Sequence, residues 1–319
     1  MSGSDETRYT ATSDWYRVSS IGEKVAIVGA GAIGLMLAAA FARVGCSVTI
    51  CGGTPTQTLT VTEGDISETT RVRHTACPAS IADHRLVVLA VKAQHTSDVG
   101  HWLRTAADPG TTVLVAQNGI EHLGRVAPYV GDSAVVPAAI HMAVERPGPG
   151  RAIVRRAAGG SDLVVPADPA ALAVARLLRA AGLRVETAAD FHSAAWLKLL
   201  VNVASNPVTT LTGRGMEVFR DPAVARYATR LLREAAEVAR ADNAAIPEDQ
   251  PERTVAWLQA LPDGASTSML DDRLAGRRLE HDALTGAVLR AATRHLIEAP
   301  QVEALHALLE GTNTAGART

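Results

Sequence analysis

The sequence predicts an α/β protein in which a doubly wound parallel sheet precedes an all-helical domain. In the first half, short apolar runs alternate with helix-favouring segments, and a glycine-rich turn follows the first run. From about residue 190, strand-like runs stop and long helical patterns follow. A chain of 319 residues exceeds what one apolar core usually supports. We therefore expect a flexible extension over 1–22, a sheet domain over 23–189 and a helical domain over 190–319.

The glycine-rich turn GAGAIG (29–34) follows the expected strand KVAIV (24–28) and opens a helix. Gly29 would permit the sharp turn, Gly31 would let backbone approach a pyrophosphate, and Gly34 would let the helix pack closely on the strand. Free amides at the helix N-terminus would bind the phosphates. This setting predicts a Rossmann-type dinucleotide-binding domain rather than a merely structural turn, with the cofactor bound by Gly29, Ala30, Gly31, Ala32, Ile33 and Gly34.

Two further candidates close apolar runs at the edge of the sheet where ligands bind. Strands are expected at 46–51, 86–92 and 111–119 and a helix at 95–107, with a loop-rich stretch before residue 86. Lys92 and Asn118 end two of these strands, at the edge where parallel sheets bind ligands. The alternatives are a surface lysine and a turn-forming Asn-Gly pair.

The choice of cofactor depends on the segment CGGTPTQTL (51–59). An acid there would bind the ribose of NAD, whereas an arginine would favour the phosphate of NADP. The segment has neither, but Thr54 and Thr56 could donate hydrogen bonds to a phosphate. We therefore favour NADP(H) over NAD(H).

The helical half contains a polar stripe within the apolar run WLKLLVNVASNP (196–207). A step of four residues rotates about 40° beyond one helical turn, so Lys198, Asn202 and Asn206 share one face. A buried lysine without a partner is costly. The stripe therefore predicts a polar cavity or an acid that satisfies the lysine, rather than a lysine whose ammonium simply reaches solvent.

A second polar constellation lies in STSMLDDRLAGRRLEHD (266–282), where Ser268 and Glu280 flank a glycine-containing stretch. A carboxylate there could meet Lys198. We interpret the other charged residues as a solvated or ion-paired face: Asp271, Asp272, Arg273, Arg277 and Arg278.

Taken together, these motifs resemble the ketopantoate reductase family. The shared features are GAGAIG, the pair VK at 91–92, QNG at 117–119, the K-x3-N-x3-NP stripe and the spacing of Ser268 and Glu280, in the family's order over roughly residues 24–300. The resemblance implies a Rossmann domain, a helical domain like the C-terminal domain of 6-phosphogluconate dehydrogenase, and NADPH-dependent reduction of a 2-oxo acid in the cleft between them. Ketopantoate, in pantothenate biosynthesis, is the first candidate substrate.

The resemblance also implies a role for each site residue. Lys198 would donate a proton to the ketone oxygen, and Glu280 would hold the cofactor ribose or orient that lysine. Lys92 would bind cofactor, and Asn118 both cofactor and substrate. The substrate's carboxylate and hydroxyl groups would be bound by Asn202, Asn206 and Ser268.

The chain departs from the family pattern at three positions. Gly53 stands where an arginine is usual, and Met216 and Ala265 stand where asparagines are common. The last two suggest a substrate less polar than ketopantoate, so a second hypothesis is a different keto acid or an imine in specialised metabolism. A third is a non-catalytic nicotinamide sensor, which would need the glycine turn but no proton donor.

Composition narrows the classes of partner. Hydrophobic residues make up 47% and charged residues 20%, as in soluble globular proteins, and no run is long enough for a membrane span. With a net charge of -2 and no basic cluster, we expect no nucleic-acid partner. Three cysteines and scattered histidines predict no metal site and a reducing, cytoplasmic location. Exposed helices could support a homodimer.

Overall fold

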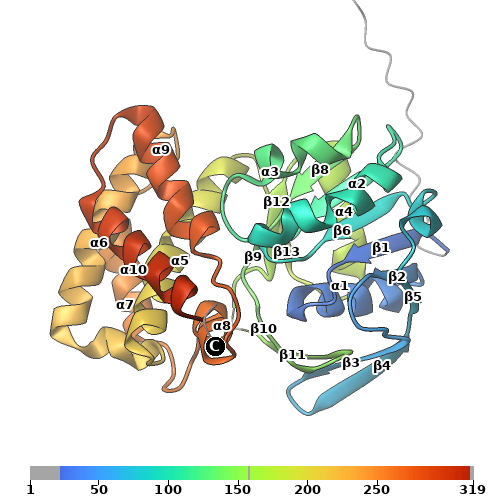
Figure 1. The fold of residues 1–319 in the computed structure, drawn as a ribbon, viewed down its shortest axis with the longest axis horizontal. Coiled ribbons are helices and arrows are strands. Elements are labelled where there is room, and N and C mark those ends of the chain that lie inside the picture. Colours follow the sequence, from blue (N-terminus) through green and yellow to red (C-terminus); the bar gives the residue numbers. More distant parts are fainter. Residues whose placement is uncertain (1–21, 157–158, 317–319) are drawn as a thin grey trace, which may run out of the picture.

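Residues 22–156 and 159–316 are described in the computed structural model of this chain. The extension expected at residues 1–22 therefore lies outside the described residues, except for Gly22. We call residues 22–188 the sheet half and residues 190–316 the helical half, because the last strand ends at Ala188 and a long helix begins at Phe191. Figure 1 shows the two halves side by side.

The sheet half contains a six-stranded parallel sheet with the order β5-β2-β1-β6-β7-β8. Its central strands β1, β6 and β7 are mostly apolar and buried, as expected where helices cover both faces of a parallel sheet, whereas the edge strand β5 is polar. The strands expected at 86–92 and 111–119 end earlier than predicted, so Lys92 and Asn118 lie in the turns that follow. The strands are β1 (Lys24–Val28), β2 (Ser47–Cys51), β5 (Arg73–Thr75), β6 (Leu86–Leu89), β7 (Thr112–Val115) and β8 (Ala134–Pro137).

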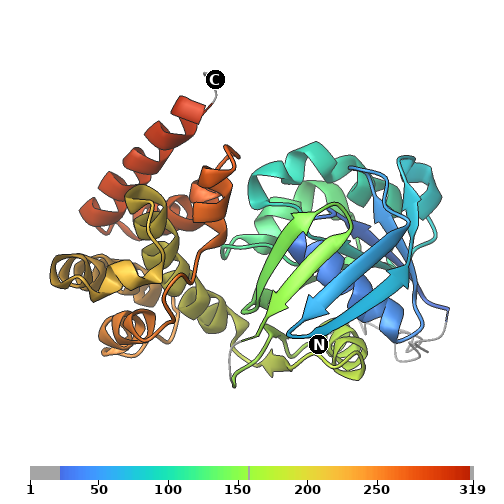
Figure 2. The same cartoon turned by 90° about the horizontal axis from the view of Figure 1, so that it is seen from below.

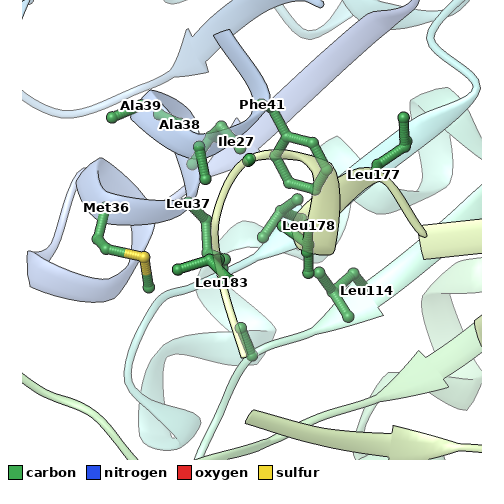
Figure 3. Close-up of a cluster of buried hydrophobic side chains, with 14 of the residues drawn as sticks. Ile27, Met36, Leu37, Ala38, Ala39, Phe41, Leu114, Leu177, Leu178 and Leu183 are labelled. Carbon is green, nitrogen blue, oxygen red and sulfur yellow. The ribbon is translucent and has the colours of Figure 1, made fainter. Parts of the chain in front are cut away.

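Helices cover both faces of this sheet, which confirms the doubly wound prediction. On one face, Phe41 and Leu178 pack with Ile27 and Leu114 in a buried apolar cluster (Figure 3). On the other face, Trp102 and Val126 pack against further strand residues. The helices of the first face are α1 (Ala32–Arg43) and α4 (Pro169–Ala180), and those of the second are α2 (Thr96–Ala106) and α3 (His122–Val130).

Two smaller sheets complete this half, and one corrects the prediction of a loop-rich stretch before residue 86. The four-stranded sheet β10-β11-β3-β4 packs on α1 and is seen clearly in Figure 2. Its strand β4 is polar and mostly exposed, so it lacks the apolar signal by which strands are recognised in a sequence. The strands are β3 (Thr58–Glu63), β4 (Ile66–Arg71), β10 (Ala143–Gly148) and β11 (Arg151–Arg155). The third sheet is formed by β9 (Ala139–Ile140), β12 (Leu163–Pro166) and β13 (Val185–Ala188).

The helical half contains helices alone among its described residues, as the sequence predicts. Its elements are α5 (Phe191–Thr212), η4 (Met216–Arg220), α6 (Pro222–Ala241), α7 (Gln250–Gln259), α8 (Ser268–Leu274), η5 (Asp282–Gly286), α9 (Ala287–His295) and α10 (Pro300–Gly316). Within 22–156 and 159–316, no helix is both long and apolar enough to cross a membrane.

Helix α5 connects the two halves. Asp190 caps its N-terminus by accepting a hydrogen bond from the Ser193 amide, and the helix continues through Pro207. It packs against β9, β12 and β13 of the sheet half and against α6 and α8 of the helical half. The polar stripe that begins at Lys198 is therefore carried by the helix at the junction of the two halves.

Candidate active site

The glycine turn has the geometry that a dinucleotide site requires. Gly29 has a φ of +115°, and a Cβ added at Gly34 would lie 1.9 Å from the Gly29 carbonyl oxygen. The turn therefore excludes side chains at both positions. Gly31 caps α1 without a side-chain hydrogen bond, and the first turn of α1 carries no acidic residue. The N-terminus of α1 is thus able to receive an anion.

Beyond β6, Lys92 is held by two acids from the helical half. Its Nζ lies 2.8 Å from Asp272 Oδ2 and 3.9 Å from Glu280 Oε2. Both carboxylates are buried, and Asp272 also accepts a hydrogen bond from Arg277 at 2.9 Å. Buried carboxylates need such partners, because an unpaired buried charge is strongly destabilising. Lys92 therefore links the two halves through these ion pairs, at the carboxyl edge of the sheet that also carries the glycine turn.

Glu280 is fixed from both halves of the molecule. Its Oε1 accepts from the Ala93 amide at 2.7 Å, and its Oε2 accepts from Asn118 Nδ2 at 2.8 Å. The segment that carries it continues into the π-helix η5, a distortion often found at functional sites. Gly119 makes the close approach possible, since a Cβ there would lie 2.6 Å from the Ala283 carbonyl oxygen.

The amide of Asn118 continues this chain of hydrogen bonds into α5. Asn202 Nδ2 donates to Asn118 Oδ1 at 3.4 Å, and Asn202 is 6% exposed. The structure thus brings together Lys92, Asn118, Asn202 and Glu280, which lie far apart in the sequence. The polar stripe of α5 faces the carboxyl edge of the six-stranded sheet at this point.

Lys198 lies one helical turn before Asn202 and is half-buried. Burial lowers its pKa to about 8, and no carboxylate pairs with it among the described residues. The predicted contact with Glu280 is absent, because that carboxylate faces Lys92 instead. Of the two lysines, only Lys198 presents an ammonium without an anionic partner in the described part of the chain.

The other two residues expected to bind substrate, Asn206 on α5 and Ser268 on α8, take no part in the hydrogen-bonded chain from Glu280 to Asn202. Asn206 is buried, and its Oδ1 accepts from Ser205 Oγ at 3.4 Å. Ser268 begins α8 and is exposed, with no hydrogen bond of its side chain among the described residues. A hydrogen bond of 2.7 Å joins the hydroxyl of Thr209 on α5 to that of Thr267, the residue before α8. Ser268 therefore lies on a helix that packs against α5, which carries the polar stripe.

The structure bears on two further expectations about polar groups. For Asp272, interpreted as part of a solvated or ion-paired face, the ion-paired alternative is confirmed: it pairs with Lys92 and Arg277, and at 4% exposed it is not solvated. Thr56, which could donate to a phosphate, instead donates its hydroxyl hydrogen to the Thr54 carbonyl oxygen at 3.0 Å in this structure. Of the two threonines, Thr54 is the exposed one.

Sequence reasoning also missed His141, which follows β9 and has an exposed side chain. Desolvation of the imidazole by the groups packed around it, and then the positive charge of Lys198, lower the pKa of His141 to about 4, so it is neutral at neutral pH. Neither a motif nor the spacing of residues marks His141, because it comes close to Lys198 only when α5 packs on β9.

Two cavities lie in different parts of the molecule, and only one of them is lined by predicted site residues. A cavity of about 230 Å³ is lined by Ala93, Gln94, Arg125 and Glu280 and lies at the junction of the halves. A larger one, about 860 Å³, lies by the outer edge of the six-stranded sheet and is lined by none of the predicted site residues. We therefore locate the candidate site by its hydrogen-bonded groups rather than by cavity size. In the described ranges no group of three or more histidine, cysteine or acidic residues could hold a metal ion.

Comparison with known families covers both halves of the chain. The family described as ketopantoate reductase PanE/ApbA matches residues 25–167, and the corresponding C-terminal family matches residues 190–313. A 2-dehydropantoate 2-reductase from Mycobacterium tuberculosis is 36% identical over 294 residues, which are 89% of this chain and 96% of the relative. One from Caulobacter vibrioides is 35% identical over 291 residues, 89% of this chain and 97% of the relative.

Solved structures agree. A PanE/ApbA family ketopantoate reductase from Ralstonia eutropha has a TM-score of 0.84 at 27% identity, covering 92% of this chain and all of the other. A ketopantoate reductase from Staphylococcus aureus, described as dimeric, has the same fold, with a TM-score of 0.78 at 21% identity and coverage of 92% and 99%. The chain belongs to the ketopantoate reductase family, and it is an oxidoreductase that acts on a C=O/CH–OH group with a nicotinamide cofactor.

Proposed function

We propose that this protein reduces a 2-oxo acid to a 2-hydroxy acid with NADPH, and that ketopantoate is the first substrate to test. The observation that carries the proposal is the ammonium of Lys198, which is half-buried and has no carboxylate partner among the described residues. It lies one turn from the hydrogen-bonded chain of Asn202, Asn118 and Glu280. The names of the relatives support the same reaction.

The chemistry needs a proton at the ketone oxygen. A bound reduced nicotinamide would supply the hydride to the carbonyl carbon. Lys198 would stabilise the charge that develops on the oxygen and donate the proton. Its pKa of about 8, lowered by burial, makes it a stronger acid than an ordinary lysine. General acid catalysis of this kind contributes about 10²–10⁴ in rate.

Amide and hydroxyl groups would hold the substrate. Asn202 and Asn206 are buried on the same face of α5 as Lys198, and Ser268 lies on the adjoining helix α8. Amides can donate to a carboxylate without adding charge. Asn118 would contact both substrate and cofactor, since it already joins Asn202 to Glu280.

The cofactor would bind along the carboxyl edge of the sheet. The residues from Gly29 to Gly34 would receive the pyrophosphate at the N-terminus of α1, and Lys92 would add a positive charge. Glu280 uses one lone pair on each oxygen, so it can still accept from a ribose hydroxyl. No acid follows β2 in the segment 51–59, and Thr54 is exposed there, which favours NADP(H) over NAD(H).

A second candidate keeps the reaction type and changes the substrate to a less polar keto acid or an imine. Met216 and Ala265, which replace the expected asparagines, lie together, because the Met216 amide donates to the Ala265 carbonyl at 2.8 Å. Met216 is buried in the apolar core of the helical half. At these two positions the chain therefore has apolar side chains where the family resemblance leads one to expect amides.

The test crosses NADPH and NADH with a panel of 2-oxo acids and imines, and follows absorbance of the reduced nicotinamide. The proposal predicts the highest kcat/KM for ketopantoate with NADPH. A preference for a bulkier keto acid or an imine would select the second candidate instead. If neither cofactor is oxidised with any carbonyl compound, catalysis is contradicted and the sensor hypothesis gains support.

The proposal also includes a cytoplasmic, homodimeric enzyme. A dimer would agree with the described state of the Staphylococcus aureus protein and with exposed apolar side chains such as Leu274 and Leu308 on the helical half. Light scattering at working concentration checks this, and a monomeric mass would contradict it.

A further inference from the structure

Arg146, which no motif identifies, reaches the glycine turn from a different sheet. It lies on β10, and its Nη1 donates to the Ala30 carbonyl oxygen at 2.8 Å. Ala30 stands between Gly29 and Gly31, directly before the N-terminus of α1. The guanidinium is therefore fixed beside the backbone that would receive a pyrophosphate.

The charge of Arg146 is not neutralised by any acid among the described residues, although neighbouring arginines are paired. Arg155 on the adjacent strand binds Glu145, and Arg156 binds Glu63 and Asp162. The only side-chain hydrogen bond of Arg146 in the described ranges goes to a neutral carbonyl. A guanidinium has five N–H donors, so most of them stay available to a second acceptor.

The backbone around Arg146 departs from regular strand pairing. The pairing of β10 with β11 shifts register between Glu145 and Gly148, and Arg146 lies inside this bulge. Bulges commonly redirect a side chain near functional sites. The neighbouring Glu145 bonds to Arg155, so it does not follow Arg146 toward the glycine turn.

The segment that carries Arg146 runs between the two ends of the candidate site. His141, at its start, lies close enough to Lys198 for that ammonium to influence it. Five residues later the chain reaches the glycine turn, and an extended strand of five residues spans about 17 Å. Strand β10 also packs against α1. Arg146 therefore lies at the phosphate end of this segment, and His141 lies at the lysine end.

From this geometry we infer that Arg146 is a cofactor-binding residue that donates to the pyrophosphate of the nicotinamide dinucleotide. The inference rests on the proposed function, since it needs a dinucleotide at the N-terminus of α1. The pyrophosphate is common to NADPH and NADH, whereas the additional phosphate of NADPH is not. Loss of the Arg146 side chain should therefore raise the Kd for NADPH and the Kd for NADH by the same factor.

The test measures Kd for NADPH and for NADH by fluorescence titration, without substrate. A charge-assisted hydrogen bond at an exposed site predicts that Arg146→Ala raises both Kd values about tenfold. Arg146→Lys, which keeps the charge but loses the planar fork, should raise them less. The matched control is Arg151→Ala, because Arg151 is an exposed arginine on β11 of the same sheet.

Each outcome decides between the claims. Equal weakening of both cofactors by Arg146→Ala, with Arg151→Ala unchanged, supports the inference. Unchanged Kd values in Arg146→Ala overturn it, and so does weakening of NADPH alone, which would assign Arg146 to the additional phosphate. An equal rise of the Kd values in Arg151→Ala would also overturn the inference. It would indicate that any positive charge on this sheet strengthens cofactor binding. If the wild-type protein binds neither cofactor, the proposed function itself fails. Thermal unfolding confirms that each variant is folded.

Discussion

The two lysines of the candidate site, one from each half, have opposite environments. Lys92 of the sheet half is ion-paired with the buried Asp272 and faces Glu280. Lys198 of the helical half has no acid beside it in the described ranges, and burial lowers its pKa to about 8. The ion pairs fix the position of Lys92, whereas burial makes the proton of Lys198 easier to release. The comparison separates a residue suited to binding from one suited to chemistry.

The same division extends to the rest of each half. The sheet half would bind the cofactor largely through backbone, at a turn whose glycines leave no room for side chains. The helical half offers side chains on α5. Adding a side chain at the glycine turn should therefore impair cofactor binding in the sheet half. Removing the ammonium of Lys198 should impair catalysis in the helical half.

The largest effect is expected from Gly34→Val, which tests the backbone side of the comparison. Its Cβ would meet the Gly29 carbonyl oxygen at 1.9 Å, so the turn must open and its amides move away from the phosphates. Loss of two such hydrogen bonds predicts a rise of at least about a hundredfold in the Kd for NADPH. Gly124→Ala is the control, since a Cβ there meets nothing within 4 Å. Equal affinity in the two variants would remove the glycine turn from the cofactor site.

The pH dependence of kcat tests the chemical side. Lys198 must be protonated to act as an acid, and its pKa is lowered to about 8. We expect kcat to be constant below that pH and to fall about tenfold per unit above it. Lys92→Met should keep the same break, because the proposal assigns Lys92 to cofactor binding and the proton transfer to Lys198. A profile of the wild-type enzyme that stays flat up to pH 10 would contradict the assignment.

The smallest expected effect is on the free energy of unfolding. Replacing Lys198 by Met should raise it, and replacing Lys92 by Met should lower it. The folded pKa of Lys198 is below its ordinary 10.5, so its charge destabilises the fold fully below about pH 8, and this cost is lost as pH rises to 10.5. Lys198→Met should therefore raise the free energy of unfolding at pH 7 by about 1 kcal/mol, after allowance for partial exposure.

The matched variant Lys92→Met should lower that free energy by about 1–2 kcal/mol, because it leaves Glu280 and Asp272 with fewer partners, although Arg277 still pairs with Asp272. Urea unfolding at pH 7 and pH 10 measures both changes. If both variants shift stability in the same direction, the contrast between the two lysines is wrong.

The sequence predicts the local parts of this site well, because they depend on short-range rules. The turn around Gly29 follows from the conformational freedom of glycine, and the stripe of Lys198 and Asn202 follows from helical periodicity. The resemblance to a family named the same residues. Strand β4 could not be predicted in this way, since its side chains are polar and mostly exposed.

Contacts between distant segments could not be predicted, and they reassign one partner. Glu280 meets Lys92 rather than Lys198, because the turn after β6, which carries Lys92 and Ala93, lies beside the segment that carries Glu280. Asp272 reads as one more surface acid in a charged run until the fold buries it. His141 and Arg146 become visible only when β9 and β10 lie along α5 and α1.

The most direct test is single-turnover oxidation of NADPH by Lys198→Ala, with saturating cofactor and the best 2-oxo acid, beside a titration of cofactor affinity. We expect a rate at least about a hundredfold below that of the wild-type enzyme, with the Kd for NADPH nearly unchanged. A rate equal to that of the wild-type enzyme would contradict the role of Lys198 as proton donor, because the reaction would then not need its ammonium.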